Sequence, residues 1–114
     1  MGARRLQETS RIFRKLPKDQ AFHFFTSVGN YTGDSAASFE EFLQSVKEVD
    51  IKSLEFHLCR GDFERWIGET LEDKELAEEV LSLRDIMPTR DVLRKRLVTI
   101  ISKRREKLLL QEAV

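Results

Sequence analysis

Helix-start signals recur at short intervals between residues 38 and 90, and they limit this part of the chain to short helices. The run Ser38-Phe-Glu-Glu41 is a capping box, in which a serine hydroxyl and a glutamate three residues later cap the first helical turn. Asp50, Asp62 and Asp73 each precede an apolar segment and are therefore predicted N-caps. Pro88 begins the last helix in the same manner.

The apolar residues between these signals repeat at the spacing of a helix face. Residues 39–49 place Phe39, Phe42 and Val46 on one side, and residues 62–71 and 73–85 carry comparable faces. We therefore expect these faces to meet in one core. Its predicted members are Phe39, Phe42, Leu54, Leu58, Phe63, Trp66 and Ile67.

Residues 51–60 fit either a helix or a strand. Leu54, Phe56 and Leu58 alternate like a strand, while Asp50 before the segment and Gly61 after it resemble the two caps of a helix. We favour the helix because Gly61 followed by an aspartate is typical of a joint between two helices.

Residues 21–26 (AFHFFT) are short and aromatic, and a glycine-containing loop follows them. Phe22 and Phe24 would share one face of a strand, although a buried helical turn fits equally well. The 114 residues are thus expected to form a mainly α, single-domain helical bundle over 1–114. Its one short β element would lie near residues 21–32.

Zero net charge conceals basic ends and an acidic middle. Residues 1–18 carry six Lys/Arg against one Glu, residues 19–88 six against sixteen Asp/Glu, and residues 89–114 eight against three. Basic helices at about 3–15 and 90–111 could contact a nucleic acid or another anion. The candidate contacts are Arg94, Arg96, Lys103, Arg104 and Arg105. We prefer the alternative that the basic ends fold against the acidic middle, since a uniformly basic domain would be the stronger nucleic-acid signal.

The last helix also carries a narrow apolar stripe that ends in three adjacent leucines. A stripe of this width suits a seam between two helices, so we expect a protein partner or a second copy of the chain to cover it. The N-terminal helix is the intramolecular alternative. The predicted interaction residues are Leu93, Leu97, Ile100, Ile101, Leu108 and Leu109.

His57, Arg60 and Asp62 form the sharpest polar cluster in the sequence. A histidine beside a carboxylate can act as a general base, or the cluster could bind a small anionic ligand through Arg60. The structural alternative makes Asp62 an N-cap, His57 a charge at a helix C-terminus and Arg60 a salt-bridge partner. We favour the structural alternative and assign no catalytic residue.

No motif for a phosphate loop, a dinucleotide or a metal occurs in the sequence, and we expect no cofactor and no metal site. The N-terminal residues lack the apolar run of a secretory signal, and no segment approaches the length of a membrane span. The single cysteine, Cys59, fits a reducing compartment. We therefore expect a cytoplasmic protein without a membrane anchor. Abundant charge with one asparagine is a pattern of heat-adapted proteins.

The run F-H-x-x-R-G-D-F-x-x-W-I over residues 56–67, with the preceding AFHFFTSVGN and SFEEFL, resembles an uncharacterised prokaryotic domain family. The similarity covers about residues 16–85 and implies no activity, cofactor or substrate. It suits an accessory or regulatory module. The sequence thus favours a non-enzymatic protein-interaction or regulatory domain, with nucleic-acid binding and a small-ligand or enzymatic site as the alternatives.

Overall fold

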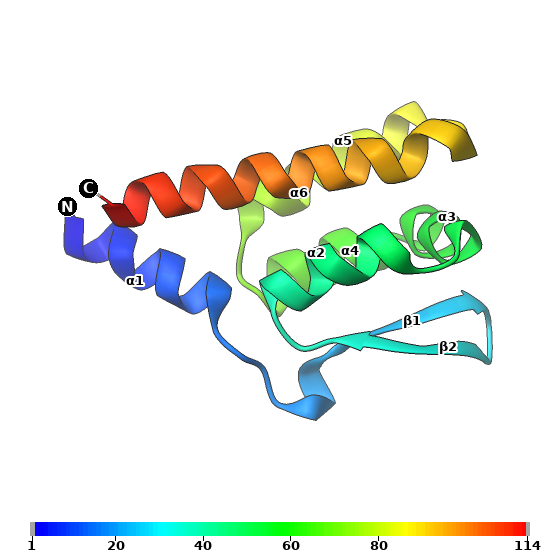
Figure 1. Cartoon of the computed structure of the whole chain (residues 1–114), viewed down its shortest axis with the longest axis horizontal. Helices are drawn as coiled ribbons and strands as arrows, with labels where there is room; N and C mark the ends of the chain where they lie inside the picture. Colours follow the sequence, from blue (N-terminus) through cyan, green and yellow to red (C-terminus); the bar gives the residue numbers. More distant parts are fainter. Residues whose placement is uncertain (1, 114) are drawn as a thin grey trace.

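Helices account for most of the chain in the computed structural model, which describes residues 2–113 and the side chains of residues 8–112 (Figure 1). A β-hairpin interrupts them after the first helix. The elements are α1 (Gly2–Phe13), a 3₁₀ turn (Lys18–Gln20), β1 (Phe22–Ser27), β2 (Asn30–Ala36), α2 (Phe39–Glu48), α3 (Ile51–Arg60), α4 (Asp62–Glu69), α5 (Lys74–Ile86) and α6 (Arg90–Ala113). The mainly α prediction is confirmed, the ambiguous segment 51–60 is a helix, and the β element extends four residues beyond its expected end.

Three of the four predicted N-caps accept the hydrogen bonds expected of them. Ser38 accepts from the Glu41 amide at 3.1 Å, Asp50 from the Lys52 amide at 2.9 Å, and Asp73 caps α5. The prediction for Asp62 was wrong, because Gly61 in a left-handed conformation serves as the cap of α4 and Asp62 is already its first residue.

Substituting Ser38 with alanine should lower the free energy of unfolding by about 0.5–2 kcal/mol, because the Glu41 amide loses its partner at a nearly buried helix end. Urea unfolding monitored by circular dichroism would measure the change. Ser45→Ala is the matched control, since it removes the same hydroxyl from the interior of α2. Equal losses in the two variants would show that the cap contributes nothing specific.

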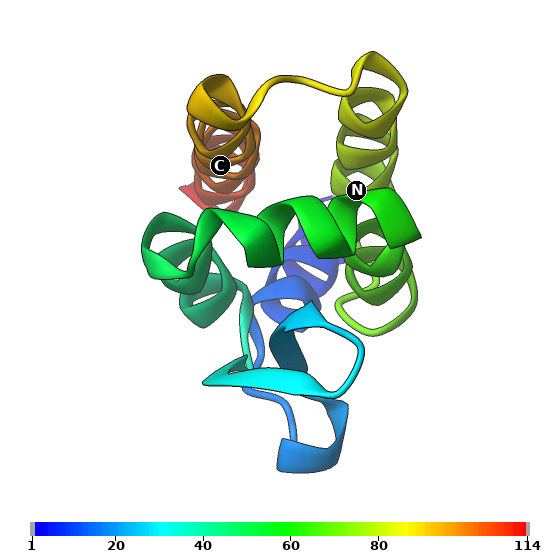
Figure 2. The same cartoon turned by 90° about the vertical axis from the view of Figure 1, so that its right-hand side faces the viewer.

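The elements stack in three levels, with α5 and α6 on one side, α2, α3 and α4 in the middle, and the hairpin on the other side (Figures 1 and 2). α3 contacts both β1 and α6, and α1 packs against α6. All seven predicted core residues are buried in one continuous cluster. Phe22 and Phe24 extend that cluster from β1 onto the middle helices, with Phe22 at 5.7 Å from Phe42 and 5.3 Å from Phe63 between ring centroids.

The apolar stripe of α6 faces this core and not the solvent. Its buried members are Leu93, Leu97, Ile101 and Leu108, each at most 1% exposed. The prediction that these four residues form an exposed interaction surface is therefore corrected, because α1, α2, α3 and α5 already pack along α6. Ile100 is half-buried, and Leu109 and Leu110 are 38% and 68% exposed. Within the described residues, no helix combines the length and the apolar character needed to cross a membrane.

Candidate binding site between the hairpin and helices α3 and α4

The joint between α3 and α4 brings the three polar candidates of the sequence together. Gly61 adopts a φ of +77°, which ends α3 and lets α4 begin at the next residue. A β-carbon at this position would lie 2.9 Å from Nη1 at the flexible end of Arg84, which can move aside, so the backbone conformation is what favours glycine. The sharp turn places the carboxylate of Asp62 within reach of both His57 and Arg60.

His57 is buried and both of its ring nitrogens are hydrogen-bonded. Nε2 lies 2.8 Å from the backbone amide of Phe25, and Nδ1 lies 2.8 Å from Oδ2 of Asp62. Because an amide can only donate, Nε2 must accept, and the proton of the neutral ring then resides on Nδ1 and is donated to Asp62. The ring therefore joins α3 to α4 and to the hairpin at once.

The hydrogen bond from the Phe25 amide to His57 also accounts for an irregularity in the hairpin. The pairing of β1 with β2 shifts on both sides of Phe25, as in a β-bulge. The Phe25 amide donates to His57. The strand thus alternates regularly at Phe22, His23 and Phe24, which are buried, exposed and buried, and loses this alternation at Phe25.

Burial lowers the pKa of His57, and the carboxylate of Asp62 offsets part of this effect. The folded protein therefore holds His57 in its neutral form more firmly than the unfolded chain does. Protonation would also convert Nε2 from an acceptor into a donor facing the Phe25 amide. His57 is consequently a structural residue here and has no free nitrogen with which to accept a proton from a substrate.

The free energy of unfolding should decrease as the pH falls from 7.5 to 5.5. The unfolded chain protonates His57 near its ordinary pKa of 6.5, whereas the folded chain protonates it only at lower pH. Acid therefore favours the unfolded state in this window, and the loss ends below the folded pKa. Urea unfolding at both pH values would measure the effect in the wild type, in His57→Gln and in the matched control His23→Gln, whose imidazole is exposed. The pH dependence should persist in the His23 variant and shrink in the His57 variant, and the reverse pattern would contradict the assignment.

Arg60 extends from the end of α3 over the ring of Phe56, with its guanidinium carbon 4.9 Å from the ring centroid. Its Nε lies 3.3 Å from Oδ2 of Asp62, while Nη1 of Arg65 lies 3.4 Å from Oδ1 of the same carboxylate. Asp62 is thus engaged through both oxygens. Arg60 remains half exposed, at 51% of its side chain.

A pocket of about 400 Å³ opens beside these residues, between the hairpin and the joint of α3 and α4. The volume falls in the range of small-molecule and side-chain binding sites. Its wall is mainly aromatic and apolar, and the only Asp, Glu, Lys or Arg residues in it are Arg60 and Asp62. The lining residues are Ala21, Phe22, His23, Phe25, Ser27, Val28, Gly29, Phe56, His57, Arg60, Asp62 and Trp66.

The sequence identified His57, Arg60 and Asp62 as one polar cluster but did not reveal that the hairpin contributes to the pocket beside them. Phe25 and Val28 line the pocket although the sequence marked them only as part of a strand and a loop. Trp66 was predicted for the core, and it both packs in the core and lines the pocket. The pairing of residues 32 positions apart, as in His57 and Phe25, leaves no signal in local spacing.

The candidate nucleic-acid contacts divide into engaged and exposed residues. Arg94 donates to the carbonyls of Val46 and Val49 at the end of α2, and Arg105 makes a two-bond pair with Glu40. Arg96 and Lys103 are exposed, and neither has an acidic partner among the described residues.

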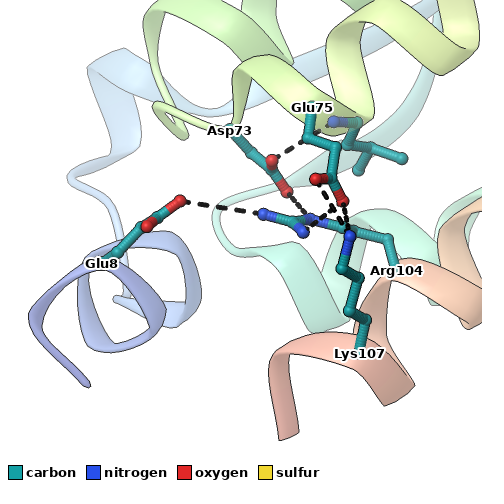
Figure 3. A network of polar contacts seen from close by, with 6 residues as sticks. Glu8, Asp73, Glu75, Arg104 and Lys107 are labelled. Atoms are coloured by element: carbon teal, nitrogen blue, oxygen red, sulfur yellow. Dashed lines mark hydrogen bonds and ion pairs between the residues drawn. The ribbon is translucent and has the colours of Figure 1, made fainter. Parts of the chain in front are cut away.

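Arg104 was a further candidate contact, and the structure corrects this prediction because the side chain is buried at 3% exposure. Figure 3 shows its guanidinium between Asp73 and Glu75 of the α5 start, with Glu8 of α1 on the far side and Lys107 beside Glu75. Nε lies 2.9 Å from Asp73, and Nη1 lies 2.5 Å from Glu75. Arg104 therefore ties α6 to the capped end of α5.

Several other basic side chains near the chain ends are also paired with acids of the middle segment. Arg11 and Arg14 reach Glu72, Lys15 reaches Glu41, and Arg90 lies 2.8 Å from Glu55. The preferred expectation, that the basic ends fold against the acidic middle, is confirmed by these pairs.

In the part of the chain that the structure describes, no three His, Cys, Asp or Glu side chains gather as a metal site would require. Cys59 is exposed and has its thiol free.

No known family model matches the chain, and neither the curated proteins nor the solved structures contain a significant match.

Proposed function

We propose that the protein is a non-enzymatic interaction domain, and that the pocket between the hairpin and the α3–α4 joint holds an apolar side chain of a polypeptide partner. The observation that carries this proposal is the aromatic wall of the pocket, formed by Phe22, Phe25, Phe56 and Trp66. Aromatic walls of this kind bind apolar and aromatic groups through burial and edge-to-face contacts.

The state of the polar residues supports binding over catalysis. A general base needs a free nitrogen or carboxylate oxygen facing the substrate. Both nitrogens of His57 are occupied, and both oxygens of Asp62 have partners. Any use of this pair in proton transfer would first have to break the bonds that join the hairpin to the helices.

The lip of the pocket supports a polypeptide partner over a small molecule. Val28, which lines the pocket at the hairpin turn, is 83% exposed, and Tyr31 on β2, whose ring centroid lies 5.4 Å from that of the lining residue Phe25, is 46% exposed. Large apolar side chains at the rim of a pocket are typical of surfaces that a protein covers, because a small ligand seated inside would leave them in water.

The other functions expected from the sequence have less support. Association through α6 loses most of its surface to the core, which leaves Leu109 and Leu110 as its exposed leucines. Nucleic-acid binding loses Arg94, Arg104 and Arg105 to internal partners. Membership of the uncharacterised prokaryotic family and a cytoplasmic location remain part of the proposal, the latter supported by the exposed free thiol of Cys59.

A titration with N-acetyl-L-phenylalaninamide, a blocked aromatic residue, tests the proposal by nuclear magnetic resonance. Trp66 is the only tryptophan, so its indole N–H gives a single reporter signal from the pocket wall. We expect this signal and the amide of Gly29 to shift with a dissociation constant on the order of 1 mM. N-acetylglycinamide should leave both unchanged.

A pair of exposed apolar residues provides the control for position. Val28→Ser should weaken binding of the phenylalanine probe, whereas Leu110→Ser, on the distant end of α6, should not. A binding site at the hairpin would be refuted if neither variant bound the phenylalanine probe saturably, or if both substitutions weakened its binding equally.

A further inference from the structure

We infer that the partner segment carries a carboxylate side chain next to the apolar side chain that occupies the pocket, and that Arg60 at the pocket rim binds this carboxylate. The inference rests on the proposed function and specifies the chemistry of the partner. It follows from the charged side chains that line the pocket, which are few and differ in how many of their polar atoms already have a partner.

Arg60 has donors left over after its internal contact is made. Its Nε faces Asp62 at 3.3 Å, and its two terminal nitrogens have no hydrogen-bond partner among the described residues. An arginine used in this way offers the paired Nη donors that match the two oxygens of a carboxylate.

Phe56 fixes where those donors lie. The guanidinium rests over the Phe56 ring at 4.9 Å, and Phe56 itself lines the pocket. The cation is therefore held against the aromatic wall, directly beside the space that an apolar anchor would occupy. A pocket of about 400 Å³ also exceeds what one aromatic side chain fills, which leaves room for part of the adjacent residue.

The same arrangement disfavours a cationic partner. Asp62 is the only acidic residue that lines the pocket, and His57, Arg60 and Arg65 already bind its two oxygens. A lysine or arginine of a partner would approach a carboxylate whose charge Arg60 and Arg65 already offset, and both arginines would repel it. An aspartate or glutamate would meet the two Nη groups of Arg60, which have no hydrogen-bond partner among the described residues.

Matched blocked dipeptides test the inference directly. N-acetyl-Phe-Asp-amide and N-acetyl-Phe-Asn-amide are almost identical in shape and differ by one charge, and the reversed sequences Asp-Phe and Asn-Phe cover the other direction of the chain. We expect the better aspartate peptide to bind about three- to tenfold more tightly than its asparagine counterpart in 20 mM salt, measured from the Trp66 indole signal. In 500 mM salt this preference should shrink, because the pair is partly exposed.

Two arginine variants assign the preference to its residue. Arg60→Gln should abolish the discrimination between the aspartate and asparagine peptides while both still bind. Arg65→Gln removes the other arginine that contacts Asp62 but does not line the pocket, and it should retain the discrimination. The two-dimensional amide spectrum of each variant verifies that it is folded.

The outcomes separate the two proposals. Equal affinity for the aspartate and asparagine peptides in the wild type, or a preference that survives Arg60→Gln, would overturn the inference and leave the apolar pocket as a binding site. Failure of all four dipeptides and of N-acetyl-L-phenylalaninamide to shift the Trp66 signal would overturn the proposed function itself.

Discussion

Trp66→Ala should lower the free energy of unfolding by about 3–5 kcal/mol, because the substitution removes the largest side chain shared by the core and the pocket wall. Trp66 is 9% exposed, and the centroid of its ring lies 5.6 Å from that of Phe22 and 5.1 Å from that of Phe42. The cavity left behind would border three elements, so no single side chain could move to fill it. Chemical denaturation of the wild type and the variant would measure the loss.

Two controls separate the contributions of the tryptophan. Trp66→Phe keeps an aromatic ring but removes the indole N–H, which donates to the Gln20 carbonyl at 2.8 Å, and should cost less than the alanine substitution. Tyr31→Ala deletes a half-exposed aromatic side chain from the hairpin and should change stability little. A small effect of Trp66→Ala, similar to that of Tyr31→Ala, would mean that Trp66 is a surface residue used for binding alone.

The helices and most of their boundaries could be predicted from the sequence because the signals involved are local. A serine or aspartate caps the amides of the next two or three residues, so Ser38, Asp50 and Asp73 act within their own helices. Asp62 was misassigned for a reason that lies outside this local chemistry. The left-handed Gly61 starts α4 without a side-chain cap and frees the Asp62 carboxylate for His57 and the two arginines.

The faces of α6 show where local periodicity stops being informative. The spacing of Leu93, Leu97 and Ile101 correctly identifies one apolar side, but it does not tell whether the cover belongs to this chain or to another. Four short elements of the same chain cover α6 together. The contacts with α1, α2 and α3 join residues far apart in the sequence, so the width of the stripe underestimated how much of the helix is enclosed.

The candidate site was predicted only in part, because local spacing does not reveal contacts with distant segments of the chain. His57, Arg60 and Asp62 stand close together in the sequence, and their cluster was recognised with both a structural and a ligand-binding interpretation. The pocket beside them depends on the hairpin, whose Phe25 amide reaches His57 from 32 residues away. Only the folded arrangement distinguishes a satisfied histidine from an available one.

Arg104→Met should destabilise the protein by about 3–5 kcal/mol, although a count of charges would class Arg104 with the surface arginines around it. The substitution keeps an unbranched, largely apolar chain in place of the aliphatic part of the arginine and leaves Asp73, which is 1% exposed, as a buried carboxylate without its cation. Such a charge must either be desolvated alone or take up a proton, and both are costly. Asp73 also caps α5 through the Leu76 amide, so the start of that helix should be affected as well.

Arg105→Met is the matched control for Arg104, since it removes the neighbouring arginine and its two-bond pair with Glu40 at the surface. It should change stability by no more than about 1 kcal/mol. Adding Asp73→Asn to Arg104→Met removes the stranded charge while an amide oxygen can still cap α5, and should therefore recover part of the loss. Urea unfolding of the four proteins at pH 7.5 would provide the comparison. Equal small effects of the two arginine substitutions would show that the buried pair contributes no more to stability than a surface pair does. If the double variant recovered no stability, the cost of Arg104→Met would arise from lost packing and not from the uncompensated charge of Asp73.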